Sequence, residues 1–346
     1  MIPNPLVSFA VLAYNQEAFV RQAVAGALAQ TYEPLEIILS DDCSTDHTFA
    51  IMQEMVAAYG GPHRIVLNRN ARNLGLVRHI NQVFATCRGE LVVGAAGDDI
   101  SVPERTATLV AEWNRIGQVP AVLYSQVQPM ARDGTPVRIP HPVVAQQETR
   151  AHRLLREWGG QVTGASCATT MSVWRTFGPL DPSLPGEDLP LTWRSALCGR
   201  FHYLPQTLVY WRIGAGGIWS STKNATPQGR VRTMLRWVSE RHLYSLQACL
   251  DVAAFPGAGW RERLAARRFR IESRCLEWGL PRGLWGLGLA CLLAFLLAGW
   301  PSRFVLRTIR LRLRYWCEEK RANTSAGWRG FFRCYYFLRR HGMPGG

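Results

Sequence analysis

Two pairs of carboxylates are the first residues in this chain that could do chemistry. Asp41 and Asp42 come directly after one apolar run, and Asp98 and Asp99 follow another. Like charges this close repel each other unless a positive group lies between or beside them. A divalent metal ion bound to a diphosphate would supply that charge, because Mg²⁺ and Mn²⁺ prefer hard oxygen ligands and commonly combine one or two carboxylates with phosphate oxygens. The pairs therefore predict metal-assisted chemistry on a phosphorylated substrate.

Several other ligand patterns are absent from the sequence. It contains no GxxxxGK[ST] motif and no GxGxxG motif after its first apolar run, which disfavours P-loop enzymes and dinucleotide dehydrogenases. Phosphate charge would then be neutralised by metal and by arginines such as Arg72 or Arg78. The eight histidines form no HxxxH or HExxH pattern and the nine cysteines form no CxxC pair, so a zinc site is disfavoured. The odd number of scattered cysteines favours reduced thiols and a cytoplasmic location.

The first half of the chain alternates short apolar runs with segments of helical periodicity. This order is typical of an α/β fold in which helices cover both faces of a mostly parallel sheet. Ligands bind in such folds outside the carboxyl ends of the strands. Tyr14 and the two carboxylate pairs follow strand ends, so one edge of the sheet should carry them all. The expected strands are Leu6–Ala13, Leu35–Ser40, Arg64–Leu67 and Leu91–Ala96, and the expected helices are Glu17–Gln30, Asp46–Tyr59, Leu76–Thr86 and Glu104–Ile116.

The pattern is less regular in the next part of the chain. Residues 129–160 are rich in Pro, Gln and Arg and predict a loop-rich excursion with one short helix near Glu148–Trp158. A strand over Ala168–Val173, a helix over Leu189–Leu197 and a strand over Tyr203–Arg212 are expected to follow.

A series of short motifs runs through roughly residues 5–215. They are Val7–Asn15, Gln30–Tyr32, Glu36–Asp46, Asn73–Gly75, Gly89–Leu91, Gly97–Asp99, Leu180–Leu184, Gly186–Asp188 and Leu208–Arg212. In order and spacing they resemble those of the inverting family 2 glycosyltransferases of the GT-A fold, of the bacterial cell-surface polysaccharide type. The resemblance implies a GT-A catalytic domain over residues 1–215.

The resemblance implies roles on the donor side. Tyr14 would pack against the nucleotide base of a UDP- or dTDP-sugar, and Asp42 would accept a hydrogen bond from the base ring. Asp98, with Asp99 beside it, would bind the Mg²⁺ or Mn²⁺ that bridges the donor's diphosphate. Arg78 is a further candidate for nucleotide-sugar binding. Structural alternatives remain open, since Tyr14 could plug a strand end and Asp42 or Asp99 could cap a helix.

The resemblance also implies roles on the acceptor side. Asp188 would be the general base that deprotonates the acceptor hydroxyl, and Glu187 would position it. Trp193 and Arg194 would line the acceptor or phosphate side, and Arg194 is a candidate for nucleotide-sugar binding. Asp188 could instead cap the following helix. The acceptor expected for such an enzyme is a saccharide, carried on a lipid if the enzyme is held at a membrane.

The sequence departs from the family pattern at two points. Ala96 stands at the first position of the family's Asp-x-Asp metal motif, and Gly214–Gly217 stands where many relatives have a histidine. Metal affinity should therefore be weak until the donor binds. These departures keep open a catalytically silent nucleotide-sugar-binding subunit or scaffold. A nucleotidyltransferase is a weaker alternative, because Ala13–Gln16 is not a Gly-rich basic loop.

The charge of the chain is concentrated in its last third. Residues 1–229 hold 18 Lys and Arg against 18 Asp and Glu, whereas residues 230–346 hold 22 against 7. Within the helix-rich region 216–346, the uncharged stretch 284–300 is flanked by arginines on both sides. Such a stretch is short for a membrane span, and an interfacial element on an anionic inner leaflet would satisfy both flanks. A buried core helix is the alternative, and missing RNA- and DNA-binding motifs disfavour nucleic acid.

Overall fold

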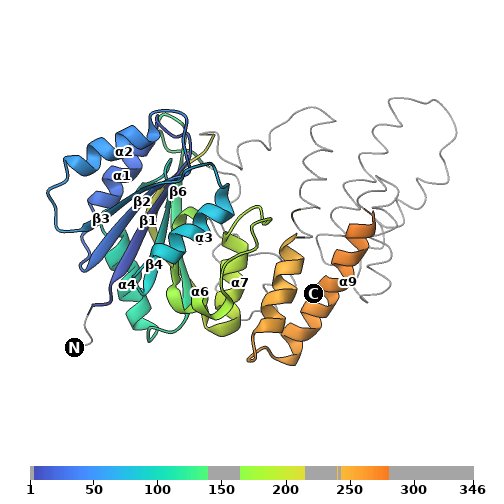
Figure 1. The fold of residues 1–346 in the computed structure, drawn as a ribbon. Coiled ribbons are helices and arrows are strands. Elements are labelled where there is room, and N and C mark those ends of the chain that lie inside the picture. The colour runs from blue at the N-terminus through green and yellow to red at the C-terminus, as the bar shows by residue number, and fades with distance from the viewer. Residues whose placement is uncertain (1–3, 139–163, 215–239, 241–242, 280–346) are drawn as a thin grey trace, which may run out of the picture. The chain divides into compact units, whose positions relative to one another are not determined.

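The computed structural model describes residues 4–138, 164–214, 240 and 243–279. The chain divides into two compact units, Met1–Arg274 and Cys275–Gly346. The first unit contains the whole sheet (Figure 1).

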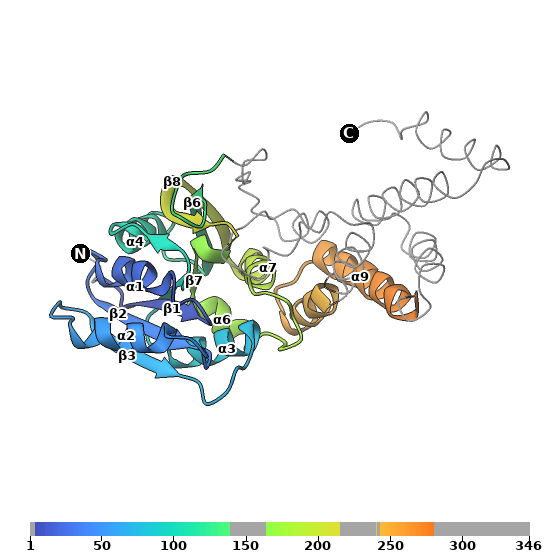
Figure 2. The same cartoon turned by 90° about the horizontal axis from the view of Figure 1, so that it is seen from above.

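One sheet of eight strands organises the first unit, in the order β3-β2-β1-β4-β7-β6-β8-β5. Its first four strands are parallel to one another, whereas β7 runs antiparallel to both of its neighbours. β6 and β8 are again parallel, and the short β5 is antiparallel to β8. Figure 2 shows β3 toward one edge of the sheet and β6 with β8 toward the other. The strands are β1 Val7–Ala13, β2 Leu35–Asp41, β3 Arg64–Arg69, β4 Leu91–Ala96, β5 Ile100–Ser101, β6 Ala121–Met130, β7 Cys167–Thr170 and β8 Arg200–Arg212.

Two hydrophobic cores lie on opposite faces of this sheet. Successive side chains of a strand point to opposite faces, and in β1 the residues Val7, Phe9 and Val11 join one core while Ala10 joins the other. α1 Val20–Leu28, α2 Thr48–Ala57 and α4 Arg105–Arg115 cover the first core. The second is covered by α3 Leu76–Thr86, α6 Met171–Phe177, α7 Asp188–Cys198, the helical residues 243–254 and α9 Trp260–Gly279.

The predicted α/β fold with a mostly parallel sheet is confirmed. The bounds of α3 and β4 coincide with those expected from the sequence. The expected strand Ala168–Val173 is partly wrong, because it ends at Thr170 and α6 begins at Met171. β6 was not expected, and residues 129 and 130 of the expected loop region are its last two residues. The helix predicted near residues 148–158 lies outside the described residues, as does the stretch 284–300.

Among the described residues, no helix is long and apolar enough to cross a membrane.

Candidate active site

The carboxyl ends of three neighbouring strands bring the predicted donor-side residues to one edge of the sheet. β1 pairs with β2 so that Ala13 faces Asp41, and with β4 so that Leu12 faces Ala96. The segments that follow these strands therefore start side by side. Tyr14, directly after β1, is 44% exposed, so its ring is open to a ligand.

Asp42 is almost fully buried and fixes the loop that leads into α3. Its Oδ1 accepts hydrogen bonds from the Asn70 Nδ2 at 2.8 Å and the Leu74 backbone N–H at 2.9 Å. Its Oδ2 accepts one from the Gly75 N–H at 2.9 Å. Gly75 has a φ of 79°, a conformation that favours glycine and that opens the helix. The carboxylate thus holds the 70–75 loop beside the expected base pocket.

Asp98 and Asp99 lie after β4 and are held differently. Asp99 is buried, and its Oδ1 accepts the backbone N–H of Arg212 at 2.7 Å. The Asp98 carboxylate is partly buried and accepts a hydrogen bond from the side chain of Gln16. Gly97 makes that approach possible, since a Cβ there would lie 2.3 Å from the Gln16 Oε1. Of the two carboxylates, Asp98 is the one better placed to take a ligand.

Arg212 at the end of β8 organises the loop that carries these carboxylates. Its Nε donates to the Asp98 backbone carbonyl at 2.9 Å, and its Nη1 to the Arg132 carbonyl at 2.6 Å. Its Nη2 donates to the Gln22 Oε1 at 2.6 Å, and the guanidinium lies 4.7 Å from the centroid of the Phe19 ring. This network joins the end of β8 to α1, to the loop after β4 and to the segment after β6. The sequence pattern indicated Arg212 only as the last residue of a motif.

Arg105, at the start of α4, is fully buried behind the same loop. Its guanidinium donates to the carbonyls of Gly94 and Ala165 at 2.8 and 2.9 Å and to the Ser101 hydroxyl at 2.9 Å. Burial lowers the pKa of Arg105 to about 10, and the charge of Asp99 counteracts part of that shift. The folded protein thus holds the buried positive charge of Arg105 close to Asp99. Nothing in the sequence indicated that this arginine would be buried.

Glu187 and Asp188 stand at the start of α7. They contact the short 3₁₀ helix Gly164–Ser166, which connects them to the region of Asp98 and Asp99. That helix contacts β4, and its Ala165 carbonyl accepts from Arg105. A Cβ on Gly164 would lie 2.7 Å from the Glu187 Oε1 and 3.5 Å from the Asp188 Cβ. The carboxylates at the start of α7 are therefore next to the segment that lies beside β4.

Burial sets the protonation of the four carboxylates. It raises the pKa of Asp99 to about 7, with the neighbouring Asp98 adding to the shift. The pKa of Asp98 is raised as well, mainly by burial. Burial raises the pKa of Glu187 to about 7 and that of Asp188 to about 6. Carboxylates with such pKa values suit proton transfer or the binding of a cation.

Arg194 and Trp193 are placed differently from the sequence expectation. Arg194 is fully buried, and its Nε and Nη2 bind both oxygens of Asp251 at 3.0 and 2.9 Å. Its Nη1 donates to the Gly178 carbonyl, and the Trp193 Nε1 donates to Asp251 at 2.7 Å. Both side chains therefore anchor α7 to the helical residues 243–254 and are buried in that contact.

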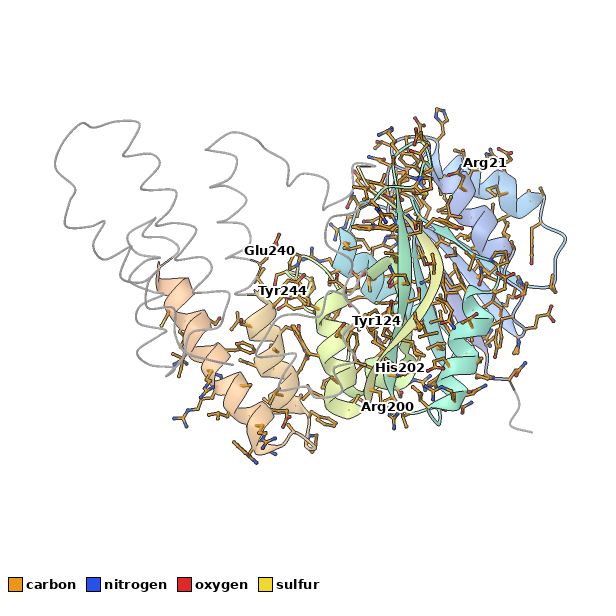
Figure 3. All side chains as sticks on the ribbon, turned by 180° about the vertical axis from the view of Figure 1, so that it is seen from behind. Arg21, Tyr124, Arg200, His202, Glu240 and Tyr244 are labelled. Atoms are coloured by element: carbon orange, nitrogen blue, oxygen red, sulfur yellow. The ribbon has the colours of Figure 1, made fainter. Side chains whose placement is uncertain are left out.

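Tyr244, on the helical residues 243–254, comes close to the start of α7 (Figure 3). Its ring meets that of Trp193 edge-on at 6.3 Å, and the charges of Asp188 and Glu187 add to the burial that raises the pKa of its hydroxyl. Hydrogen bonds from Ser183 lower the pKa of Asp181, and the charge of Arg78, exposed on α3, adds to that shift. Arg72 is exposed in the loop before α3. Of these three residues, only Tyr244 is close to the carboxylates of α7.

The described residues offer the expected metal ion only a few ligands. Within the described ranges, no group of three or more His, Cys, Asp or Glu side chains could hold a metal ion. Asp98 offers a partly buried carboxylate and Asp99 a second one beside it, with Ala96 in place of a third. Since Mg²⁺ and Mn²⁺ often combine one or two carboxylates with phosphate oxygens, these residues suit a metal that arrives with a diphosphate.

The sequence matches one family model and is similar to several known proteins. Residues 8–171 match the family model of glycosyl transferase family 2. The uncharacterized protein Rv1520 of Mycobacterium tuberculosis is 29% identical over 221 residues, which are 62% of this chain and 61% of that protein. WcaA of Escherichia coli K12, named for glycosyl transfer in colanic acid biosynthesis, is 32% identical over 113 residues, which are 33% of this chain and 39% of WcaA. The chain thus matches less than two-thirds of the length of these relatives.

Two solved structures share the fold. TarS 1-349 of S. aureus in complex with UDP-GlcNAc gives a TM-score of 0.51 at 15% identity, covering 86% of this chain and 93% of that one. The mannosyltransferase PcManGT of Pyrobaculum calidifontis, in complex with GDP-Man and Mn²⁺, gives 0.50 at 16% identity, covering 86% of each. Residues 8–171, just under half of this chain, are thus similar to glycosyl transferase family 2.

Proposed function

We propose that this chain transfers a hexosyl or deoxyhexosyl group from a UDP- or dTDP-sugar to a hydroxyl of a saccharide acceptor, with inversion at the anomeric carbon. One observation supports this reading above others. The 3₁₀ helix Gly164–Ser166 contacts β4, which ends just before Asp98, and also contacts Glu187 and Asp188. A metal-binding carboxylate and a candidate base thereby flank one region, as a displacement between donor and acceptor requires.

On the donor side, the exposed Tyr14 ring would pack against the nucleotide base. Asp42 would shape the base pocket through the 70–75 loop, with one remaining acceptor position on its Oδ2 for the base. Asp98 would hold Mg²⁺ or Mn²⁺, with Asp99 beside it fixed by Arg212. When bound, the metal supplies positive charge against the negative charge that develops on the departing diphosphate.

On the acceptor side, Asp188 would take the proton of the attacking hydroxyl. Its pKa of about 6 leaves it ionised at neutral pH and makes it a stronger base than an ordinary aspartate. The Leu189 backbone N–H donates to its Oδ1 at 2.9 Å, which fixes one oxygen and leaves the other for the acceptor. Glu187, packed against Gly164, would position Asp188.

The acceptor we propose is a lipid-linked saccharide of cell-surface polysaccharide assembly, used by an enzyme peripheral to the inner face of the membrane. The name of WcaA, with its reference to colanic acid, supports a role of this kind. The charge excess of residues 230–346 supports a position on an anionic surface.

The test is a panel of UDP-, dTDP- and GDP-sugars, assayed with Mn²⁺ for binding, hydrolysis and transfer. The wild type should turn over one donor, Asp98→Ala should abolish its metal-dependent binding, and Asp188→Asn should bind it but transfer no sugar. Binding of a donor without turnover in the wild type would favour the silent subunit. Release of pyrophosphate from a nucleoside triphosphate would favour a nucleotidyltransferase.

A further inference from the structure

α9 exposes an apolar stripe on the side that faces away from the core. Trp260 is 70% exposed and Leu264 is 41% exposed, and the half-buried Ile271 follows at the same helical phase. Residues four and seven positions apart lie on one face of an α-helix. Ala266 and Phe269 on the opposite face are buried in the core. This helix therefore carries apolar side chains on both faces, and the described residues of the first unit bury only one of these faces.

Arginines border the exposed stripe on both sides. Arg261 and Arg268 are seven residues apart along one border. On the other border they recur at intervals of three and four residues. All are exposed, and this second group is Arg263, Arg267, Arg270 and Arg274.

The neighbouring helical residues 243–254 expose apolar side chains too. Leu250 is 59% exposed and Leu246, one turn before it, is 39% exposed. Between residues 243 and 254, the other exposed residues are Ala253 and Ala254, so that face carries no charge. The inner faces of the two helices pack together, as shown by the Cys249 thiol that donates to the Ala266 carbonyl at 3.0 Å.

An apolar stripe bordered by arginines has the chemistry of a helix that lies in a membrane interface. The apolar side chains enter the acyl region, and the long arginine side chains reach the anionic headgroups. Single-stranded nucleic acid also binds basic surfaces, but it stacks its bases on several aromatic rings. Here Trp260 is accompanied by leucine and isoleucine, which favours lipid.

We propose that the surface formed by Trp260, Leu264 and Ile271 with the bordering arginines docks this protein on an anionic phospholipid bilayer. The surface lies outside the residues that match the family model and shares no residue with the candidate active site. It is also distinct from the stretch 284–300. The proposal therefore does not depend on the donor chemistry, although docking there would bring the enzyme to a lipid-linked acceptor.

The experiment is co-sedimentation of the full chain with vesicles of phosphatidylcholine alone and with vesicles that also contain phosphatidylglycerol. Wild type should bind the anionic vesicles more strongly, and less so as salt is raised. Arg267→Gln/Arg268→Gln should weaken this binding roughly thirty-fold, since each arginine near an anionic surface contributes about a fivefold gain. Trp260→Ala/Leu264→Ala should weaken it as well, whereas Trp260→Phe should retain most of it.

The matched control is Arg88→Gln/Arg175→Gln, which removes the same charge from exposed positions before residue 215 and should bind as wild type does. Thermal unfolding of each variant checks that all of them fold. Equal binding by wild type and the α9 variants, or no preference for anionic vesicles, would overturn the proposal. Tighter binding of wild type to a single-stranded RNA oligonucleotide than to anionic vesicles would do so too. Donor hydrolysis, measured without vesicles, tests the proposed glycosyl transfer separately.

Discussion

The pKa of Asp188 defines the pH range in which this residue can accept a proton. A carboxyl group whose pKa is raised to about 6 is protonated below that pH and ionised above it. We therefore expect kcat for sugar transfer to fall about tenfold for each pH unit below about 6 and to level off above about 7. Steady-state rates at saturating donor and acceptor check this. A rate that stays level down to pH 4.5 would exclude Asp188 as the base.

The same shift implies that Asp188 reduces the stability of the fold at neutral pH. A carboxyl group with a folded pKa above its unfolded value contributes stability at low pH, and that contribution is lost as pH rises from about 4 to about 6. Asp188→Asn should therefore raise the free energy of unfolding at pH 8 by about 1 kcal/mol, a figure reduced because the group is only partly buried. At pH 4 the gain should vanish. Urea unfolding at both pH values measures it.

Asp181 provides the control for this prediction. It lies in the segment that precedes α7, but hydrogen bonds from the Ser183 backbone and hydroxyl lower its pKa. Asp181→Asn should therefore lower stability at pH 8 or leave it unchanged. If both variants gained stability to the same extent, an effect common to any Asp→Asn change in this region would explain the result better than burial of Asp188.

At the scale of elements, the parallel half of the sheet was the part that the sequence could predict. β1, β2 and β4 are buried on both faces, and such strands appear as continuous apolar runs followed by the polar residues of the ligand edge. β6 was missed because polar residues such as Gln126 and Gln128 interrupt its second half. The strand over 168–173 was overextended because Met171 and Val173 are buried in a helix as they would be in a strand.

The carboxylates of the site could be predicted, whereas their supporting cations could not. Asp98 and Asp188 stand in short motifs beside strand and helix ends, where chemistry is expected. Arg105, Arg194 and Arg212 are buried, yet in sequence they look like any surface arginine. Their partners are backbone carbonyls or distant residues, as with Arg194 and Asp251, which are 57 positions apart. Such pairings depend on tertiary structure, which neither periodicity nor a local motif reveals.

The anchor of α7 permits a prediction for this element. Asp251 is 3% exposed and accepts hydrogen bonds from Arg194 and Trp193 of α7 and from Gln247. Asp251→Ala should lower the free energy of unfolding by about 3–5 kcal/mol, because it leaves the buried Arg194 guanidinium without its counter-ion. The milder Asp251→Asn should lower kcat more than it weakens UDP binding, since α7 begins with Asp188. Urea unfolding and steady-state kinetics measure the two effects.

An exposed ion pair of similar geometry provides the comparison for Asp251. Arg21 donates to both oxygens of Glu54 at 3.0 and 2.8 Å, but both side chains are more than half exposed. Glu54→Ala should cost less than about 1 kcal/mol and leave kcat unchanged. If Asp251→Ala cost no more than Glu54→Ala, the buried network would not anchor α7.

At the scale of the whole molecule, the candidate site and the charge excess lie in different parts of the sequence. The sheet edge gathers the carboxylates, whereas the positive charge lies beyond residue 229. Charge of one sign on one part of a protein orients it on an oppositely charged surface. Balanced charge in residues 1–229 and an excess of arginines beyond them are what the proposed reaction of a soluble donor with a surface-bound acceptor requires.

The sparse metal ligands lead to a prediction about the stability of the whole fold. Because no third His, Cys, Asp or Glu of the described residues joins Asp98 and Asp99 in a possible metal site, Mn²⁺ alone should raise the unfolding temperature very little. UDP and Mn²⁺ together, at about a hundred times their joint dissociation constant, should stabilise the fold by about 2.7 kcal/mol. With an unfolding entropy of about 2.1 cal/mol/K per residue, this corresponds to a rise of about 5 °C for the unit Met1–Arg274. Differential scanning fluorimetry with Mn²⁺, UDP, both, and both plus EDTA measures the rise. Asp98→Ala should abolish the synergy and leave the small effect of UDP alone. A full shift with Mn²⁺ alone would instead require a complete protein-only metal site.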